Sequence, residues 1–381
     1  MRRRAAAALG LTFALSSCGL RSVVPDGAPR VAQARLPPYG KMPLLDVSES
    51  RLDAERSAGR TIPFFKGAIE SPLDGKTYHF VIAGSNPNKS SGATHILYVP
   101  IVIVFHFPDG TVLDPRKPAC NDSVSVEQRL LRGPNFVPAD LVSNGVYVGK
   151  AQLGDGFQRA EFWKIVKLHG AEYHTILSPI AKPVVIDVNA PSGSTTNAGV
   201  CFGASHRIGK ISFRAFKSIA NDLTEKYATP AALALLFNYN TFIVLPSGCC
   251  FLGIHGALKR PTGIQVLAWS AYNDAGSYAY LPTAEDISIS THEIGETLND
   301  PFVRNATPAW GHIGQYPLGC SNLFEVGDPL TGVNFRVKHG RFAYHPQELA
   351  FFSWFYRTHS IGTGGKYSFE GTIRKPQPLC R

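Results

Sequence analysis

The chain has 381 residues, of which 44% are hydrophobic and 17% are charged, and it carries a formal net charge of +10. This balance is typical of a globular protein and excludes a chain that is disordered throughout. Lysine and arginine are scattered along the sequence, and no basic stripe with interleaved aromatic residues indicates nucleic-acid binding.

The N-terminus predicts an exported lipoprotein. Three arginines at residues 2–4 precede a short apolar run over residues 5–15, which is typical of a signal peptide covering residues 1–17. Leu15-Ser16-Ser17-Cys18 reads as a lipobox, so a lipid on Cys18 would anchor the protein to the membrane of the cell envelope. The alternative is an ordinary secretory signal in which Cys18 is incidental and the protein is secreted.

The mature chain is expected to have an α+β fold in three parts. Residues 18–60 are rich in proline, arginine, serine and alanine without periodicity, which predicts a flexible tether. Residues 61–150 are expected to form a β-rich N-terminal region, and residues 151–381 an α+β domain in which helical and strand patterns alternate. After the signal peptide, no apolar run in the sequence is long enough to predict a transmembrane helix.

Hydrophobic patterning places the individual elements. Strands are expected over residues 77–82, 96–107, 111–113, 181–188, 241–246 and 263–270. Pro100 falls inside the second of these, which favours an edge strand or two shorter strands because proline cannot donate a ladder hydrogen bond. Helices are expected over residues 156–167, 213–227, 230–237, 283–300 and 347–356. The third begins at Thr229 and Pro230, and the last is interpreted as a buried aromatic helix rather than a binding platform.

Six cysteines follow Cys18, and an even number in an exported chain predicts disulfides. The alternative is a set of buried free thiols. Because Cys249 and Cys250 are adjacent, we expect them to pair with two different partners. The six are Cys120, Cys201, Cys249, Cys250, Cys320 and Cys380.

The helix expected over residues 283–300 carries the chemistry. Thr283 and Asp286 predict its N-terminal cap, and Pro301 its end. An apolar stripe through Ile294 predicts that the helix turns its polar face away from the core. The alternative is a surface helix whose polar residues are solvated.

The polar face of this helix predicts a metal site. His292 and Glu296 are one turn apart, so an imidazole and a carboxylate can reach one ion. Glu293 is rotated from His292 by about 100° and is expected to act as general base instead of ligand. The pattern resembles the His-Glu-x-x-His helix of zincin metallopeptidases and implies Zn²⁺. Glu296 in place of the second histidine keeps Ca²⁺ and Mn²⁺ as alternatives.

Other ligands must come from elsewhere in the chain. We favour Glu325 over Asp328 as the third ligand, with His312 as a rival because imidazole is the softer donor. His255 lies in a glycine-flanked turn, where it can orient a substrate beside the metal or only bond the backbone.

The segment that runs from His292 to Pro301 resembles one in the secreted phosphate-induced, EXORDIUM-like family and in related bacterial exported proteins. Two further pieces follow the order of that family: Cys250-Phe251-Leu252-Gly253-Ile254-His255-Gly256 and Phe324-Glu325-Val326-Gly327-Asp328. The resemblance covers roughly residues 235–330. It implies a secreted protein with a metalloprotease-like, zincin-like core.

These patterns predict a metal-dependent hydrolase, with peptide bonds as the leading substrate. In that mechanism the metal polarises the scissile carbonyl and Glu293 activates a water. The alternative is a non-catalytic protein that binds an envelope or cell-wall polymer and retains a degenerate zincin-like fold.

Overall fold

The computed structural model describes residues 45–381, apart from residues 90–91, 121, 171, 202–203, 247, 280, 312–319, 377–379 and 381. The signal peptide, Cys18 and His312 therefore lie outside the described residues, as does the side chain of Cys249. The described part is a mixed α+β structure, as expected, and belongs to one compact unit.

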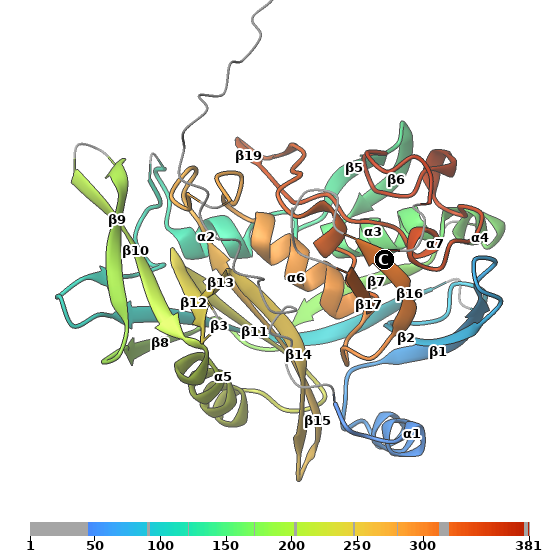
Figure 1. Cartoon of the computed structure of the whole chain (residues 1–381), viewed down its shortest axis with the longest axis horizontal. Helices are drawn as coiled ribbons and strands as arrows, with labels where there is room; N and C mark the ends of the chain where they lie inside the picture. The colour runs from blue at the N-terminus through green and yellow to red at the C-terminus, as the bar shows by residue number, and fades with distance from the viewer. Residues whose placement is uncertain are drawn as a thin grey trace, which may run out of the picture. The chain divides into compact units, whose positions relative to one another are not determined.

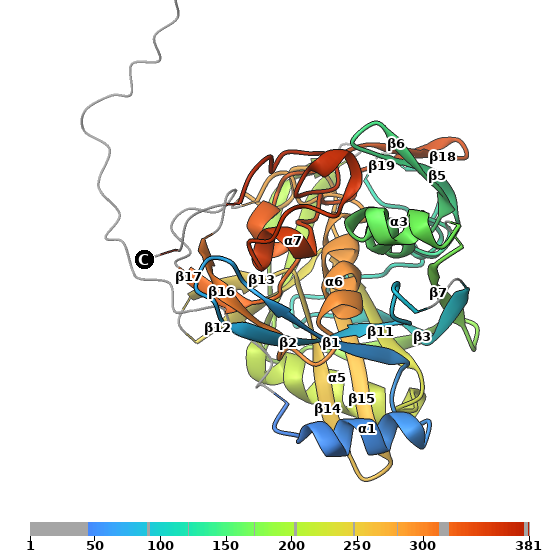
Figure 2. The same cartoon turned by 90° about the vertical axis from the view of Figure 1, so that its right-hand side faces the viewer.

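The helices are short and the strands numerous (Figures 1 and 2). The helices are α1 (Glu49–Ser57), α2 (Val126–Leu131), α3 (Leu153–Glu161), α4 (Trp163–Leu168), α5 (Phe213–Tyr227), α6 (Ser288–Asn299) and α7 (Phe352–Phe355), with 3-10 turns η1 (Asp328–Leu330) and η2 (Thr363–Gly365). The strands are β1 (Phe64–Glu70), β2 (Thr77–Ala83), β3 (Ala93–His106), β4 (Val112–Leu113), β5 (Ala139–Ser143), β6 (Val146–Ala151), β7 (His174–Pro179), β8 (Val184–Asn189), β9 (Ser194–Cys201), β10 (Ala204–Ser212), β11 (Leu233–Tyr239), β12 (Thr241–Leu245), β13 (Gly248–Phe251), β14 (Gly253–Arg260), β15 (Gly263–Tyr272), β16 (Ala306–Gly311), β17 (Cys320–Leu323), β18 (Val337–His339) and β19 (Phe342–Tyr344).

One seven-stranded sheet organises the chain. Its order is β14-β15-β11-β3-β4, and β7 and β8 also pair with β3. The strands β15, β11 and β3 are parallel, whereas β14 runs antiparallel to β15. Because β3 comes from the expected N-terminal region and β11 and β15 from the expected second domain, the two regions share one sheet.

Pro100 lies in the middle of this sheet, so the expectation of an edge strand was wrong. On one side of β3, the proline pairs with Leu235 of β11. On the other side, β7 pairs with residues 93–98 and β8 with residues 101–106. Pro100 therefore falls at the gap between two partner strands, where no ladder hydrogen bond is required of it.

The helix expected over residues 230–237 is also wrong, because residues 233–239 form the central strand β11. Every residue of β11 is buried, since it lies between β3 and β15 with both faces covered. A continuous apolar run of this length cannot be assigned to helix or strand by periodicity alone.

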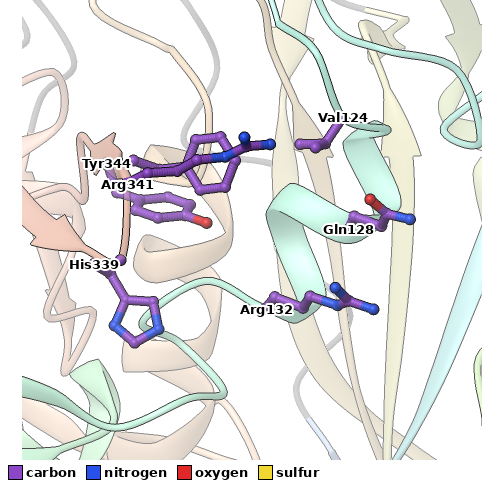
Figure 3. A pocket seen from close by; sticks show the side chains of 8 residues that line it. Val124, Gln128, Arg132, His339, Arg341 and Tyr344 are labelled. Carbon is purple, nitrogen blue, oxygen red and sulfur yellow. The ribbon is translucent and has the colours of Figure 1, made fainter.

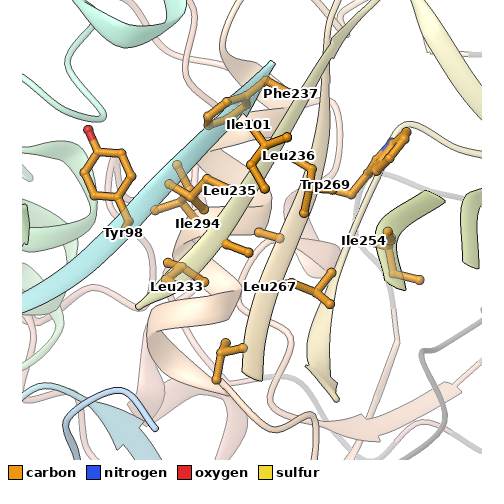
Figure 4. Packing of buried hydrophobic residues seen from close by; sticks show 14 of the residues in the cluster. Tyr98, Ile101, Leu233, Leu235, Leu236, Phe237, Ile254, Leu267, Trp269 and Ile294 are labelled. Carbon is orange, nitrogen blue, oxygen red and sulfur yellow. The ribbon is translucent and has the colours of Figure 1, made fainter. Parts of the chain in front are cut away.

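Helices cover both faces of the sheet, with α6 on one side and α5 on the other (Figures 1 and 2). Trp269 of β15 packs edge-on against Phe216 of α5, with ring centroids 5.2 Å apart. Ile294 of α6 belongs to the same apolar cluster as Trp269 and the β11 side chains (Figure 4). This packing holds α6 firmly against β14 and β15.

Helix α6 is buried on all sides, which excludes the alternative of a solvated surface helix. It begins at Ser288, later than expected, and its N-cap residue Ile287 makes no side-chain cap. The expected Thr283 cap fails because Asp286 has a positive φ of 38° and its carboxylate accepts from the backbone N–H of His345 at 3.0 Å. The helix ends at Asn299, just before Pro301, as expected.

The aromatic C-terminal segment is buried, as expected, but only Phe352–Phe355 of it is helical. Its earlier residues are extended, because Gln347 and Ala350 form isolated β-bridges to Asn334 and Ser368. This extended course brings Gln347 into contact with His292 of α6.

Two disulfides, Cys120–Cys201 and Cys320–Cys380, join residues that lie 81 and 60 positions apart. Cys250 is disulfide-bonded as well. Within the expected tether, residues 49–57 form α1, and Leu52 and Glu55 are fully buried. None of the helices in the described ranges has the length and apolarity needed to cross a membrane.

Candidate metal centre

Helix α6 presents His292, Glu293 and Glu296 toward the same region of the interior. Positions i, i+3 and i+4 are neighbours on a helix surface, so Glu293 and Glu296 lie side by side one turn apart. The three residues are only 7%, 5% and 3% exposed. A helix that places three ionisable side chains in the interior needs compensating charges around it.

His255 reaches the cluster from β14. Its cross-strand neighbour on β15 is Ala268, whose small side chain leaves room for α6 over this part of the sheet. The imidazole Nδ1 lies 3.3 Å from Glu296 Oε2 and 3.6 Å from Glu293 Oε2. His255 is therefore part of the cluster and is not merely a turn residue bonded to the backbone.

The segment after β17 closes the cluster with two carboxylates. Asp328 Oδ1 is 3.5 Å from His292 Nε2, and Glu296 Oε1 is 3.1 Å from the same nitrogen. Glu325 lies on the other side, with Oε2 3.5 Å from His255 Nε2. The structure thus groups Asp328, and not the favoured Glu325, with His292 and Glu296, while the ligand assignment itself stays a prediction. The rival His312 lies outside the described residues.

The spacing of these atoms fits metal ligands better than hydrogen bonds. Two ligand atoms about 2.1 Å from a tetrahedral ion are about 3.4 Å apart. This is close to the separations of 3.3 and 3.6 Å from His255 Nδ1 to Glu296 and Glu293 and of 3.5 Å from His292 Nε2 to Asp328. His255 Nε2, Glu293 Oε2 and Glu325 Oε2 are buried atoms without a hydrogen-bond partner. The residues present therefore fit a bound cation.

Gln347 determines which nitrogen of His292 faces the cluster. Its amide Nε2 donates to the carbonyl of Gly327 at 2.7 Å, which directs Oε1 toward His292 Nδ1 at 3.2 Å. Since Oε1 can only accept, Nδ1 carries the proton in the neutral imidazole and Nε2 is left to bind a metal. Partners of this kind fix the tautomer of ligating histidines.

Two glycines allow the backbone to approach the cluster. A Cβ at Gly327 would lie 2.6 Å from the ring of His292, and one at Gly253 would lie 2.3 Å from Glu293 Oε1. The Gly327 N–H also donates to Glu296 Oε1 at 3.1 Å. Any larger residue at either position would therefore collide with the cluster. This steric requirement comes from tertiary contacts and cannot be predicted from the local sequence.

The electrostatics of the cluster follow from burial and from the mutual effect of its members. Burial alone would lower the pKa of His255 and of His292, but the surrounding carboxylates raise both well above the usual range. Burial raises the pKa of Glu293 to about 6 and that of Glu325 well above its usual range. Burial would also raise the pKa of Glu296, yet the two histidines hold it low.

Two sets of ligand atoms lie close enough together to hold an ion. One consists of His292, Glu296 and Asp328, and the other of His255, Glu293 and Glu296. The sequence pointed to all five residues, but it did not indicate Gln347 or the two glycines. Gln347 joins the site through its long-range contact with His292, and the sequence around Gln347 does not indicate this role.

A separate pocket lies between α2 and the β18–β19 hairpin (Figure 3). Its lining includes Arg132, His339 and Arg341 beside the rings of Phe342 and Tyr344. None of its lining residues belongs to the metal cluster.

The chain has no match among family models, curated proteins or solved structures. The function is therefore inferred from the side chains of the site itself.

Proposed function

We propose that this protein is an exported metal-dependent hydrolase, with peptide bonds as its leading substrate class. The observation that carries the proposal is the set of buried His292, buried Glu296 and half-buried Asp328, in which Gln347 leaves His292 Nε2 available as a ligand. Export is inferred from the signal peptide and lipobox, and the disulfides are compatible with it.

The roles of the side chains follow from their positions. His292, Glu296 and Asp328 would hold the ion, and Gln347 keeps the imidazole in the ligating tautomer. A bound divalent metal supplies a Lewis acid that polarises a carbonyl and acidifies water. Gly327 brings its backbone N–H to Glu296 and thereby orients this carboxylate. Asp328 is half-buried, so the ligand set is nearest to solvent at this residue.

A second candidate function is a non-catalytic envelope-binding protein with a structural metal. The observation that favours it is the closure of the cluster, since His255, Glu293 and Glu325 are each at most 5% exposed. Structural metal sites are closed, whereas catalytic sites keep an open position. The two candidates share the metal and differ only in whether a substrate reaches it.

The deciding experiment combines metal analysis with a cleavage assay on a mixed peptide library. We expect purified protein to retain a divalent transition metal and to cleave peptides, and both properties to vanish with a chelator and return when Zn²⁺ is restored. His292→Ala should lose the metal, whereas the matched change at exposed His169 should not. Bound metal stabilises the fold by mass action, by about 2.7 kcal/mol at a hundredfold excess over Kd.

Each outcome assigns a function. Stoichiometric metal with no cleavage of peptides or other hydrolysable substrates would favour the binding protein. A parent chain that takes up no metal, before or after reconstitution, would overturn both candidates. Chelation and reconstitution of the parent keep the test valid even where His292→Ala fails to fold.

A further inference from the structure

The two ligand sets of the cluster share one residue, Glu296. Glu296 directs Oε1 toward His292 Nε2 at 3.1 Å and Oε2 toward His255 Nδ1 at 3.3 Å. Its two oxygens therefore serve two different imidazoles on opposite sides of one carboxylate. A carboxylate that presents one oxygen to each of two ligand sets has the arrangement of a bridge between two ions.

The second set contains three ligand residues, and Glu296 is the only one that it shares with the first set. His255 Nδ1, Glu293 Oε2 and Glu296 Oε2 lie close together, and all three residues are buried. Glu293 Oε2 has no hydrogen-bond partner, although it is directed into this set. A buried, charged oxygen without a partner is costly unless an ion occupies the space beside it.

Glu325 supplies the support that a ligating His255 needs. Its Oε2 lies 3.5 Å from His255 Nε2, on the side of the ring away from Glu296. The two atoms are not hydrogen-bonded among the described residues, but the negative charge of a carboxylate there favours the tautomer with the proton on Nε2, which leaves Nδ1 free for a metal. Gln347 does the same for His292 through its contact with Nδ1. Each imidazole thus has one nitrogen facing Glu296 and the other facing an orienting oxygen.

The charge of the cluster also matches two ions better than one. Four carboxylates, those of Glu293, Glu296, Glu325 and Asp328, converge on two imidazoles. Among the described residues, no lysine or arginine pairs with the three glutamates. With all four carboxylates ionised and both imidazoles neutral, as in a metal-loaded cluster, one divalent ion would leave a formal charge of about −2, whereas two ions would neutralise the four carboxylates.

The geometry points to a dinuclear centre, in which Glu296 bridges one divalent cation held by His292 and Asp328 and a second held by His255 and Glu293. This inference rests on the proposed function and deepens it, because paired ions about 3.5–4 Å apart are a device of hydrolases that clamp the attacking and leaving oxygens. It changes the role of Glu293 from general base to ligand. The carboxylates of the ligand sets favour Mn²⁺, and their imidazoles also suit Zn²⁺.

The test uses Mn²⁺ as the probe on the chelated full-length protein. Titration monitored by metal analysis should reach two ions per chain. At that ratio, electron paramagnetic resonance should show an exchange-coupled pair in place of the six-line signal of isolated Mn²⁺. This readout requires neither activity nor a variant.

Variants then assign the ligands. Glu293→Gln should lose the ion that His255 helps to hold, bind one ion and lose the coupled signal. Asp328→Asn should lose the ion that His292 helps to hold, with the same loss of coupling. Glu296→Gln should abolish coupling altogether. Glu325→Gln should keep two ions but bind them roughly 10–100-fold more weakly, as loss of an orienting partner does, and Glu172→Gln at an exposed position should match the parent.

Saturation at one uncoupled ion would overturn the dinuclear centre. A Glu293→Gln protein that still binds two coupled ions would overturn the assignment of Glu293 as a ligand of the second ion. In the latter case Glu293 would return to the role of general base. A coupled pair in a protein that hydrolyses nothing would instead support the centre and overturn the hydrolase, so the two proposals fail separately.

Discussion

Glu161 of α3 carries a carboxyl group that is buried next to Phe352 of α7. It is fully buried, and one oxygen accepts from the backbone N–H of Phe352 at 3.0 Å while the other has no hydrogen-bond partner. Burial raises its pKa well above the usual range, against the smaller opposite effect of the Phe352 N–H. The folded protein therefore holds Glu161 in its neutral form at pH values where the unfolded chain ionises it.

This difference predicts a pH dependence with a definite sign. Because the folded state binds the proton more tightly, the contribution of Glu161 to stability is complete below about pH 4.5 and falls as pH rises toward the raised pKa. The fall is at most about 1.4 kcal/mol per pH unit. Glu161→Gln removes the dependence, so its stability relative to the parent should increase between pH 5 and pH 8 in urea unfolding.

The difference between the pH–stability curves of Glu161→Gln and of the parent isolates the effect of Glu161 from that of the metal cluster. Glu172→Gln, at an exposed position, is the matched control and should give a constant difference from the parent. A constant difference for Glu161→Gln as well would show that this carboxyl group does not change its protonation on folding.

At the scale of elements, the cluster depends on how closely two backbone segments approach α6. The turn that contains Gly327 covers His292, and the start of β14 at Gly253 covers Glu293. Gly327 has φ −84°, a conformation open to any residue, so its requirement for glycine is steric and not conformational.

Gly327→Ala and Gly253→Ala should therefore push the covering segments away from α6. We expect each to lower metal affinity at least tenfold and to destabilise the protein by about 1–3 kcal/mol, as overpacking does. Gly92→Ala is the control, because a Cβ there meets nothing within 4 Å. Calorimetric titration with Zn²⁺ and thermal melting measure both effects. Parent-like affinity in both variants would mean that the segments yield without disturbing the ligands.

At the scale of the whole molecule, two disulfides close long loops. Cys120–Cys201 spans 81 positions and Cys320–Cys380 spans 60, and the second pair attaches the C-terminal segment to β17. In the chain-entropy account, loops of these lengths stabilise the fold by similar amounts, which differ by only about 0.3 kcal/mol.

Replacing both cysteines of either pair by serine should lower the free energy of unfolding by about 2–4 kcal/mol, measured by denaturant titration. Because the loop lengths are similar, we expect the two double variants to lose nearly equal stability. A much larger loss for one pair would show that packing around that disulfide, and not loop closure, dominates. Variants that both unfold like the parent would show that the bonds do not form.

Features that depend on local spacing could be predicted from the amino-acid sequence. His292 and Glu296 share a helix face because a four-residue interval matches the helical repeat, and Glu293 neighbours Glu296 through a three-residue interval. The site of helix termination before Pro301 and four strands outside the sheet centre, β2, β4, β8 and β12, follow from equally local rules. The signal peptide, the lipobox and the family resemblance are sequence predictions of the same kind, and they stay predictions.

Only the tertiary structure decided what joins that helix face. His255 belongs to the cluster because the register of β14 on β15 places it opposite Ala268, and Asp328 and Gln347 arrive on segments far along the chain. Neither Pro100 in a central strand nor β11 in place of a helix can be predicted locally, since each depends on which strands lie beside it. Pairing between distant segments is selected by burial of the whole sheet, and no short window of sequence contains that information.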